Sequence, residues 1–273
     1  MTVIAQSLSS GSSGNGFLVR SGATVILVDC GLGPRVLAAA MRPHGLAPRD
    51  LSAILITHEH DDHVRGLAPL RKLRIPIRCS AGTAGALRLE AQEHAVVSAG
   101  CPFECGEALV TPIAVSHDAA EPMGYAMTLA GFRICVVTDL GTPNEELAVE
   151  IASADLIVLE SNHDEHMLRS GPYPAYLKRR VASENGHLSN RNAGAFLEQV
   201  LRAERRRRTI WLAHLSQTNN HPDLARRTVA SAFGDDAALH DIVPLPRRTA
   251  GPIWRPEPVP RTLQLDFIGS VNS

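Results

Sequence analysis

The chain has 273 residues, of which 44% are hydrophobic and only 4% aromatic, so aliphatic side chains must fill most of its core. Its formal net charge is −1, which excludes a chain-wide cationic field for nucleic acid and leaves only a local patch for that role. Five irregularly spaced cysteines and the lack of an apolar stretch of membrane-spanning length favour a cytoplasmic protein with free thiols and no membrane contact.

The N-terminal part of the chain predicts strands that alternate with short helices. Apolar, β-branched runs mark the strands, and helical spacing of apolar side chains marks the helices. Pro34 is suited to the first turn of a helix. The expected strands span residues 2–8, 17–20, 24–29, 53–57 and 75–79, and the expected helices span residues 34–42, 64–73 and 81–93.

The C-terminal part continues this alternation, with a hairpin turn expected at Ala130-Gly131. No linker is long enough to divide the chain, so we expect one domain that spans residues 1–273. The expected strands span residues 95–98, 109–116, 123–129, 132–138, 156–160 and 209–213, with a final edge strand at 263–267, and the expected helices span residues 145–151, 173–183 and 191–202.

The segment AILITHEHDDHVRG, residues 53–66, carries the strongest chemical signal. His58, His60, Asp62 and His63 follow the expected strand directly. The alternation of an extended backbone puts His58 and His60 on one side, and the following turn brings Asp62 and His63 to a second point nearby. A solvated histidine-rich loop is the alternative, but four potential ligands within six residues favour a metal site. The spacing suggests two metals about 3.5–4 Å apart.

Three further candidate ligands each follow an apolar, β-branched strand. These are His117, Asp139 and His214. Rigid strand ends that converge on one edge can hold such a cluster. Imidazole and carboxylate without thiolate suit Zn²⁺, and also Mn²⁺ or Fe. Two divalent ions lower the pKa of a water between them, so hydrolysis is the expected chemistry.

The pattern His-x-His-x-Asp-His at residues 58–63 resembles the signature of the metallo-β-lactamase superfamily. The resemblance implies an α/β fold, the four-layer αββα sandwich with two mixed sheets flanked by helices. It implies that His58, His60 and His117 bind one metal, that Asp62, His63 and His214 bind the other, and that Asp139 bridges both. It also implies that Asp29 accepts a hydrogen bond from a ligand histidine, although a turn or helix-capping carboxylate is an equal reading.

Two residues are expected to take part in catalysis. Asp62 can orient the attacking hydroxide through its free oxygen. The run GHLSN, residues 186–190, resembles the GHxS-type element of tRNA-processing and related phosphodiesterases of this fold. That resemblance implies that His187 contacts the scissile phosphate or protonates the leaving oxygen, near an anion-friendly helix N-terminus. A surface histidine beside a helix cap is the alternative.

Several other polar residues are candidate substrate contacts. Asn15 closes a small-residue run that forms either a hairpin turn or an anion-binding loop. Ser189 belongs to the GHLSN element and is also a natural N-cap. His163 is expected either to contact substrate or to support a ligand.

A basic and aromatic helix face is the expected nucleic-acid contact. Tyr176 and Arg180 are four residues apart, and Tyr173 lies one turn earlier, an arrangement suited to base stacking plus phosphate contact. A surface helix with extended side chains is the equal alternative. The run Arg205–Arg208 is expected to be a solvated helix terminus, which the helix dipole explains without nucleic acid.

The combined motifs are similar to the WalJ-type (YycJ/VicX) branch of the superfamily over residues 7–220. The resemblance implies a 5′-to-3′ DNA exonuclease, with DNA favoured over RNA. A small-molecule hydrolase of the same fold, acting on cyclic phosphodiesters or thioesters, is the second hypothesis, and the near-neutral charge favours it. A non-catalytic regulatory or redox module is the third. The sequence leaves metal identity and oligomeric state open. The motifs that carry the resemblance are SLSSGSSGNG, SHDAAEPMGY, TDLG, ESNHDEHMLRSGPYPAYLKRRV, GHLSN and LAHLS.

Overall fold

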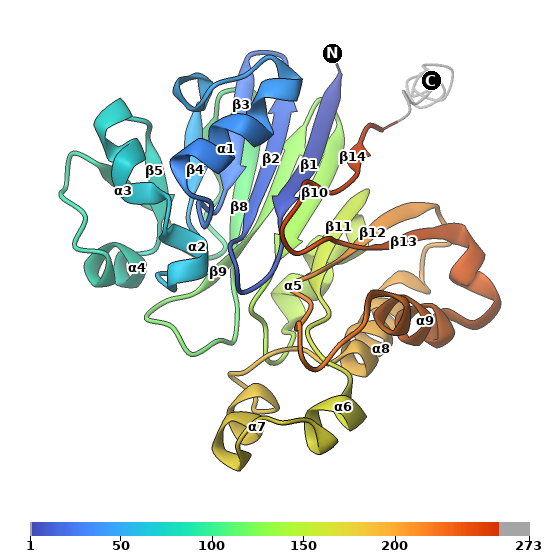
Figure 1. Ribbon diagram of the computed structural model, residues 1–273. Coiled ribbons are helices and arrows are strands. Elements are labelled where there is room, and N and C mark those ends of the chain that lie inside the picture. Colours follow the sequence, from blue (N-terminus) through green and yellow to red (C-terminus); the bar gives the residue numbers. More distant parts are fainter. Residues whose placement is uncertain (1, 257–273) are drawn as a thin grey trace, which may run out of the picture.

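Two seven-stranded mixed sheets pack face to face in a computed structural model that describes residues 2–256 (Figure 1). The first sheet has the order β14-β1-β2-β3-β4-β5-β6, and the second has the order β13-β12-β11-β10-β9-β8-β7. The first sheet contains β1 (Val3–Ser9), β2 (Gly16–Ser21), β3 (Thr24–Val28), β4 (Ala53–Leu55), β5 (Ile77–Cys79), β6 (His94–Val96) and β14 (Ile253–Trp254). The second contains β7 (Phe103–Cys105), β8 (Ala108–Ala114), β9 (Met123–Leu129), β10 (Phe132–Val137), β11 (Leu156–Glu160), β12 (Arg208–Ala213) and β13 (His240–Pro244).

The two sheets repeat one pattern of strand pairing. In each, a run of antiparallel strands is followed by parallel strands, beginning with the pair β3–β4 in the first sheet and β10–β11 in the second. The parallel strands β3 and β11 are buried along their whole length and rich in Val, Ile and Leu, as expected for strands covered on both faces. The carboxyl ends of the parallel strands in both sheets therefore meet at one edge of the sandwich.

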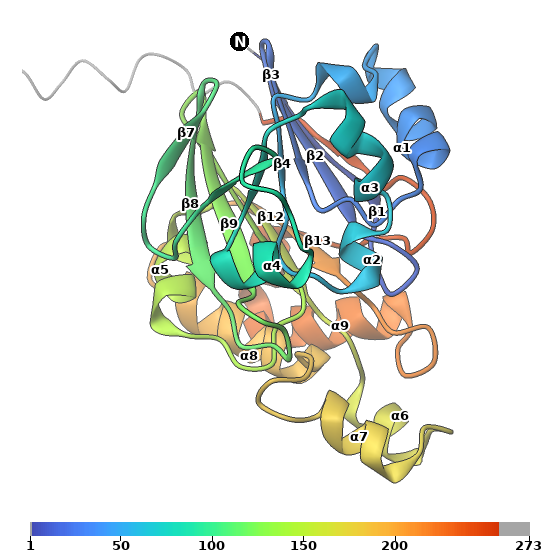
Figure 2. The ribbon, with the colours of Figure 1, turned by 90° about the vertical axis from the view of Figure 1, so that its left-hand side faces the viewer.

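Helices cover the outer face of each sheet and complete four layers (Figure 2). Leu37 and Met41 of α1 pack on the first sheet, and Leu147 and Ile151 of α5 pack on the second. The helices are α1 (Pro34–Met41), α2 (Asp61–Val64), α3 (Leu67–Leu70), α4 (Ala81–Ala86), α5 (Glu145–Ser153), α6 (Glu165–Ser170), α7 (Ala175–Val181), α8 (Asn190–Leu201) and α9 (Pro222–Phe233). The predicted αββα sandwich is confirmed.

The central core lies between the sheets and fixes the strand that leads to the first histidines. Trp211, Phe17 and Tyr125 are among its largest buried side chains. The Tyr125 hydroxyl donates to the Ile56 carbonyl at 2.7 Å, which ties the second sheet to the segment just before His58. A buried tyrosine normally satisfies its hydroxyl in this way, and here the bond also holds the two sheets in register at the edge of the sandwich.

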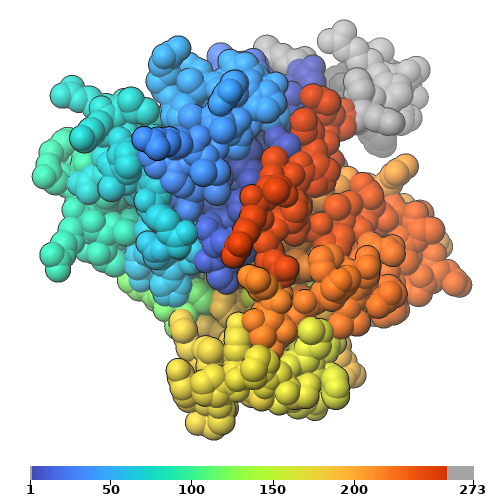
Figure 3. All heavy atoms as spheres, in the orientation of Figure 1, coloured from blue at the N-terminus to red at the C-terminus, as the bar shows by residue number. Residues whose placement is uncertain are grey.

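Helices α6 and α7 stand apart from the sandwich, below the edge where the strand ends meet (Figures 1 and 2). In the space-filling view they form a separate lobe at the foot of the molecule (Figure 3). None of the described helices combines the length and apolar character needed to span a membrane.

Several expected elements differ from the structure. The hairpin at Ala130-Gly131 is confirmed, with both residues at positive φ as a two-residue turn requires. The helix expected over residues 81–93 ends at Ala86, because Arg88 adopts a left-handed conformation that stops it. Strands β7, β13 and β14 were not predicted, since short edge strands carry little pattern. The edge strand expected at 263–267 lies outside the described residues.

The expectation for the arginine run was wrong at its last residue. Arg208 begins β12 and is only 2% exposed. Its guanidinium donates to the Ala152 carbonyl at 2.8 Å and to the Glu204 carboxylate at 2.9 Å. Arg206 pairs with Asp155. These two arginines are themselves buried or half-buried and stabilise the fold through these contacts, rather than forming a solvated helix end.

Candidate metal centre

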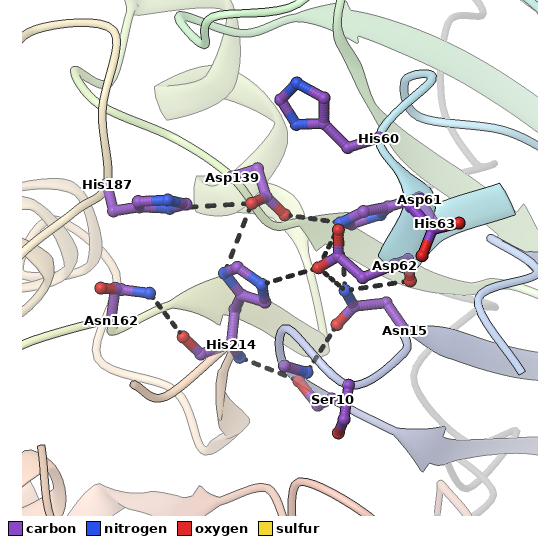
Figure 4. Close-up of polar contacts among 12 residues, drawn as sticks. Ser10, Asn15, His60, Asp61, Asp62, His63, Asp139, Asn162, His187 and His214 are labelled. Carbon is purple, nitrogen blue, oxygen red and sulfur yellow. Dashed lines mark hydrogen bonds and ion pairs between the residues drawn. The ribbon is translucent and has the colours of Figure 1, made fainter. Parts of the chain in front are cut away.

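The seven predicted ligands converge at one edge of the sandwich. Figure 4 labels His60, Asp62, His63, Asp139 and His214 among them. They come from the ends of both sheets: His58 follows β4, His117 follows β8, Asp139 follows β10 and His214 follows β12. The helix α2 supplies Asp62 and His63. Ligand atoms lie within 4.8 Å of one another in three overlapping groups, which are His58, His60 and His117; Asp62, His63 and His214; and His58, His63 and Asp139.

Asp139 lies between the two histidine groups. Its Oδ2 is 3.0 Å from His63 Nε2, and its Oδ1 is 3.8 Å from His117 Nε2 and 3.4 Å from His214 Nδ1. The His58 Nε2 and His60 Nδ1 atoms are 3.1 Å apart. Asp62 Oδ2 lies 3.4 Å from His214 Nε2 and 3.6 Å from His63 Nε2. The spacing of these donor atoms suits divalent metal ions.

Outer hydrogen bonds orient four of the histidine rings. His63 Nδ1 lies 2.7 Å from Asp29 Oδ2, and His214 Nδ1 lies 2.9 Å from Glu160 Oε1. The two remaining Nδ1 atoms, of His58 and His117, bond to the Thr57 hydroxyl at 3.0 Å and the Gly186 carbonyl at 3.1 Å. Metal-binding histidines are held in this way, with one ring nitrogen fixed and the other free for the ion.

A second observation indicates that these donors suit divalent metal ions. His117 Nε2 is buried and has no hydrogen-bond partner among the described residues. Such an orphaned acceptor costs free energy unless a cation or water satisfies it. The nitrogen and oxygen donors, without thiolate, suit Zn²⁺, Mn²⁺ or Fe.

The carboxylates also make the site attractive to positive charge. Burial lowers the pKa of His63, but Asp29 and Asp139 outweigh it and raise that pKa to about 10. Burial favours the neutral form of Asp139, yet His214 and His63 hold its pKa well below the ordinary value. Histidines that hold protons in this way would give them up to a divalent ion, because metal binding requires neutral imidazole.

Three of the polar residues at the strand ends have a strained backbone. Asp29, Asp139 and His214 have φ angles of 61°, 57° and 55°. Left-handed conformations are uncommon for residues other than glycine and cost about 1–3 kcal/mol each, and they gather at functional sites. Asp29 follows β3 and Asp139 follows β10, so the two carboxylates occupy equivalent positions in the repeated pairing of the two sheets.

His187 lies beside the centre, on the opposite side of His214 from Asp62 (Figure 4). Its ring centroid is 5.2 Å from that of His117 and 5.3 Å from that of His214. Its Nδ1 lies 2.9 Å from Glu160 Oε1 and 3.6 Å from Asp139 Oδ1. Burial lowers the pKa of His187, but Glu160 and Asp139 outweigh that effect and raise it.

Glu160 is the functional residue that sequence reasoning missed. It ends β11, is fully buried, and its Oε1 contacts both His187 and His214. Its Oε2 accepts from the Leu140 and Leu188 amides. Burial favours its neutral form, but His187 and His214 lower its pKa to about 2. The signal that could have found it is its position after an apolar strand, the same position as Asp139.

Asn15, Ser189 and His163, the predicted substrate contacts outside α7, are buried. The Asn15 amide nitrogen is 3.2 Å from Asp62 Oδ2 and 3.0 Å from His63 Nε2, so it packs against two predicted ligands. Ser189 caps α8 by accepting from the Asn192 amide, and it forms an isolated β-bridge with His163. Their contacts hold the centre and the loop of His187.

The remaining predicted contacts lie on or beside α7, where Tyr173 and Arg180 line one cavity and Tyr176 does not. Tyr173 precedes the helix rather than beginning it, and Tyr176 is 67% exposed. Arg180 donates from Nε to Asp118 Oδ2 at 2.6 Å, and Asp118 Oδ1 is 3.3 Å from His117 Nε2. A cavity of about 160 Å³, here called the α7 pocket, is lined by Ser12, Asp118, Asn162, Tyr173, Leu177, Arg180, Val181, Gly186, His187 and Ser216.

Comparisons with known proteins agree with this geometry. Residues 24–214 match the model of the Beta-lactamase superfamily domain. The chain is 36% identical to Exodeoxyribonuclease YycJ of Bacillus anthracis over 87% of its own length and 94% of that protein. It is 33% identical to Exodeoxyribonuclease WalJ of Streptococcus pneumoniae, over 87% of its length and 93% of that protein. The crystal structure of the metallo-β-lactamase fold protein YhfI from Bacillus subtilis shares the fold, with a TM-score of 0.71, 18% identity, and coverage of 93% of this chain and 99% of that one.

Proposed function

The chain belongs to the β-lactamase superfamily, within the branch of the YycJ and WalJ exodeoxyribonucleases, and from that premise we propose that it removes nucleotides from the 5′ ends of DNA. It is a metal-dependent hydrolase of phosphodiesters. The ligand sets proposed for its two metal ions are His58, His60 and His117 for one, and Asp62, His63 and His214 for the other, with Asp139 shared.

The observation that carries this proposal is the position of His187. Hydrolysis of a phosphodiester needs a nucleophile on one side of the phosphorus and a proton for the leaving oxygen on the other. Asp62 and His187 lie on opposite sides of His214 (Figure 4). His187 has a raised pKa and a fixed Nδ1, so its Nε2 can carry a proton at neutral pH. A thioester hydrolase has less need of such an acid, because a thiolate leaves without a proton.

The chain's own residues have separate tasks in this reaction. When bound, the metal ions lower the pKa of a water and neutralise charge on the phosphate. Asp62, held by the Asn15 amide, orients the nucleophile through its other oxygen. His187 protonates the 3′ oxygen as it leaves, and Glu160 holds the imidazole in position. Zn²⁺ and Mn²⁺ are the ions that we propose, and Fe fits the same donors.

DNA is proposed as the substrate over RNA because the relatives that match 87% of the chain are exodeoxyribonucleases. The ribonuclease Z of Methanopyrus kandleri matches only 37% of the chain. We also propose a cytoplasmic location. All five cysteines are unpaired and four of them are buried, which fits a reducing compartment.

Purified protein reconstituted with Zn²⁺ or Mn²⁺ tests the proposal. We expect it to shorten 5′-labelled linear DNA and to hydrolyse bis-p-nitrophenyl phosphate, with much slower action on RNA of the same sequence. Asp139→Asn should lower both the metal content, measured by mass spectrometry, and the activity. Metal-replete protein that cuts no phosphodiester would overturn the assignment, and RNA cut as fast as DNA would overturn the substrate.

A further inference from the structure

The α7 pocket lies on the leaving-group side of the metal centre. His187, the proposed acid, forms part of its wall, and Asn162 forms another part. In Figure 4 both residues lie on one side of His214, whereas Asp62 and Asn15 lie on the other. A group that enters the pocket is therefore the part of the substrate that departs with the leaving oxygen.

The pocket has room for one small group and not for several nucleotides. Its volume of about 160 Å³ is roughly half that of the smallest pockets for drug-sized ligands. Helix α7 closes one side with Leu177 and Val181, and the chain runs from α7 directly to the His187 loop, where the His187 amide donates to the Val181 carbonyl at 2.9 Å. A phosphate with part of a sugar fits this volume.

Arg180 supplies the pocket with a partly engaged cation. Its Nε donates to Asp118, and among residues 2–256 its two terminal amino groups make no hydrogen bond. The side chain is 57% exposed. Paired amino groups of this kind match two oxygens of a phosphate. Asp118 holds the guanidinium in position without using them.

We propose that the α7 pocket binds the 5′-phosphate and the sugar of the terminal nucleotide of DNA, with the phosphate on the free amino groups of Arg180; this inference rests on the proposed phosphodiesterase function. Tyr173, in the same wall, is placed to contact the sugar or base. The pocket thus accounts for attack at an end rather than within a strand.

The position of the pocket also fixes the polarity of attack. Hydroxide adds to the phosphorus between the first and second nucleotides, the bond to the 3′ oxygen of the first breaks, and His187 gives that oxygen a proton. The first nucleotide leaves as a 5′-monophosphate, and the shortened chain carries a new 5′-phosphate. Attack from a 3′ end would instead put the whole remaining chain on the leaving side, where the pocket has no room for it. Each cycle regenerates the end group that the pocket recognises.

The test compares linear DNA that carries a 5′-phosphate with the same DNA that carries a 5′-hydroxyl. We expect the metal-loaded wild-type protein to prefer the phosphorylated end by about 10- to 100-fold in kcat/KM, the loss expected when a charged hydrogen-bond partner is removed. Arg180→Gln should reduce this ratio to near one, and Arg180→Lys should give an intermediate value. Arg179→Gln, an exposed neighbour on the same helix, should keep the wild-type ratio.

A second measurement avoids DNA. Thymidine 5′-monophosphate should inhibit hydrolysis of bis-p-nitrophenyl phosphate at least about tenfold less well in Arg180→Gln than in Arg179→Gln, by the same loss of a charged contact. Equal rates on both DNA ends, or a wild-type ratio in Arg180→Gln, would overturn the proposed 5′-phosphate binding in the α7 pocket. The phosphodiesterase function would then still stand. Failure to cut any DNA or the small diester would instead overturn the function itself.

Discussion

Glu160 Oε1 lies 2.9 Å from His187 Nδ1, and this contact joins the proposed acid to the metal centre. The same oxygen lies 2.9 Å from the Nδ1 of His214, a predicted ligand. One buried carboxylate therefore fixes the tautomer of both rings. It leaves the Nε2 of His214 free for a metal and the Nε2 of His187 free for a proton.

Replacing Glu160 by glutamine should damage both roles. The carboxylate has four donors around it, two imidazoles on Oε1 and the Leu140 and Leu188 amides on Oε2. A glutamine amide nitrogen would face two donors in either orientation. We expect metal affinity to fall about 10- to 100-fold and turnover about 10²- to 10⁴-fold.

The pH dependence of kcat distinguishes a positioning role of Glu160 from a general loss of structure in the Glu160→Gln variant. Glu160 raises the pKa of His187, so in Glu160→Gln the alkaline limb of kcat should move to lower pH. Glu146→Gln, exposed on α5, is the matched control and should keep the wild-type profile. If the alkaline limb of kcat is unchanged in Glu160→Gln, then the contact with Glu160 does not set the pKa of His187 during turnover.

His187→Ala should keep its metal and lose turnover according to the leaving group. On DNA, the loss of the proton donor should cost about 10²- to 10⁴-fold in kcat. On bis-p-nitrophenyl phosphate the loss should be much smaller, because p-nitrophenolate leaves without a proton. His166→Ala, exposed on α6, serves as the control. Equal losses on both substrates would assign His187 a role other than that of the acid.

The sequence predicted the donor cluster well because a simple local rule governs it. A polar residue directly after a buried strand lies at the strand's carboxyl end, and parallel strands bring those ends together. Asp139 and His214 obey this rule, and so does Glu160. Glu160 was missed because a glutamate after an apolar run also begins many exposed loops.

The α7 pocket could not be predicted because it depends on contacts between distant segments. Asp118 and Arg180 are 62 positions apart, and nothing local in either segment indicates their pairing. The helix face was also misassigned. Tyr176 and Arg180 were expected to share one face, but Arg180 lines the pocket with Leu177 and Val181, whereas Tyr176 is exposed and does not line it. The rotation of a short helix about its axis is decided by packing, which its seven residues do not encode alone.

Metal uptake should release protons from His63 and His214 but not from His58 and His117. The raised pKa of His63, about 10, and that of His214, well above the ordinary value, keep both rings protonated at pH 7 in metal-free protein. A metal ion must displace those protons before it can bind. The metal affinity of the set that contains His63 and His214 should therefore rise with pH, up to about pH 10 where His63 is concerned. Burial lowers the pKa of His58 and His117 below 6.5, so both are already neutral at pH 7.

Calorimetric titration with Zn²⁺ in buffers of different ionisation enthalpy counts the protons released. We expect up to two protons for the ion held by His63 and His214, and none from His58 and His117. His63→Ala should remove one of them. Equal, proton-free binding of both ions at pH 7 would contradict the assignment of charge to these histidines.

Gly31→Ala should destabilise the backbone contacts that hold Asp62 in place. A Cβ at Gly31 would lie 1.8 Å from the Asp62 carbonyl oxygen and 2.6 Å from the Asn15 amide nitrogen, both backbone atoms. Those two atoms form a 2.7 Å hydrogen bond that holds Asp62 in place. Overpacking of this kind costs about 1–3 kcal/mol, and the displaced Asp62 should also weaken metal binding.

Gly85→Ala in α4, where a Cβ meets nothing within 4 Å, should instead stabilise the protein by about 0.5–1 kcal/mol. Denaturant unfolding with and without Zn²⁺ measures both effects, and a Gly31→Ala variant as stable and as metal-replete as Gly85→Ala would show that the loop can move aside without cost.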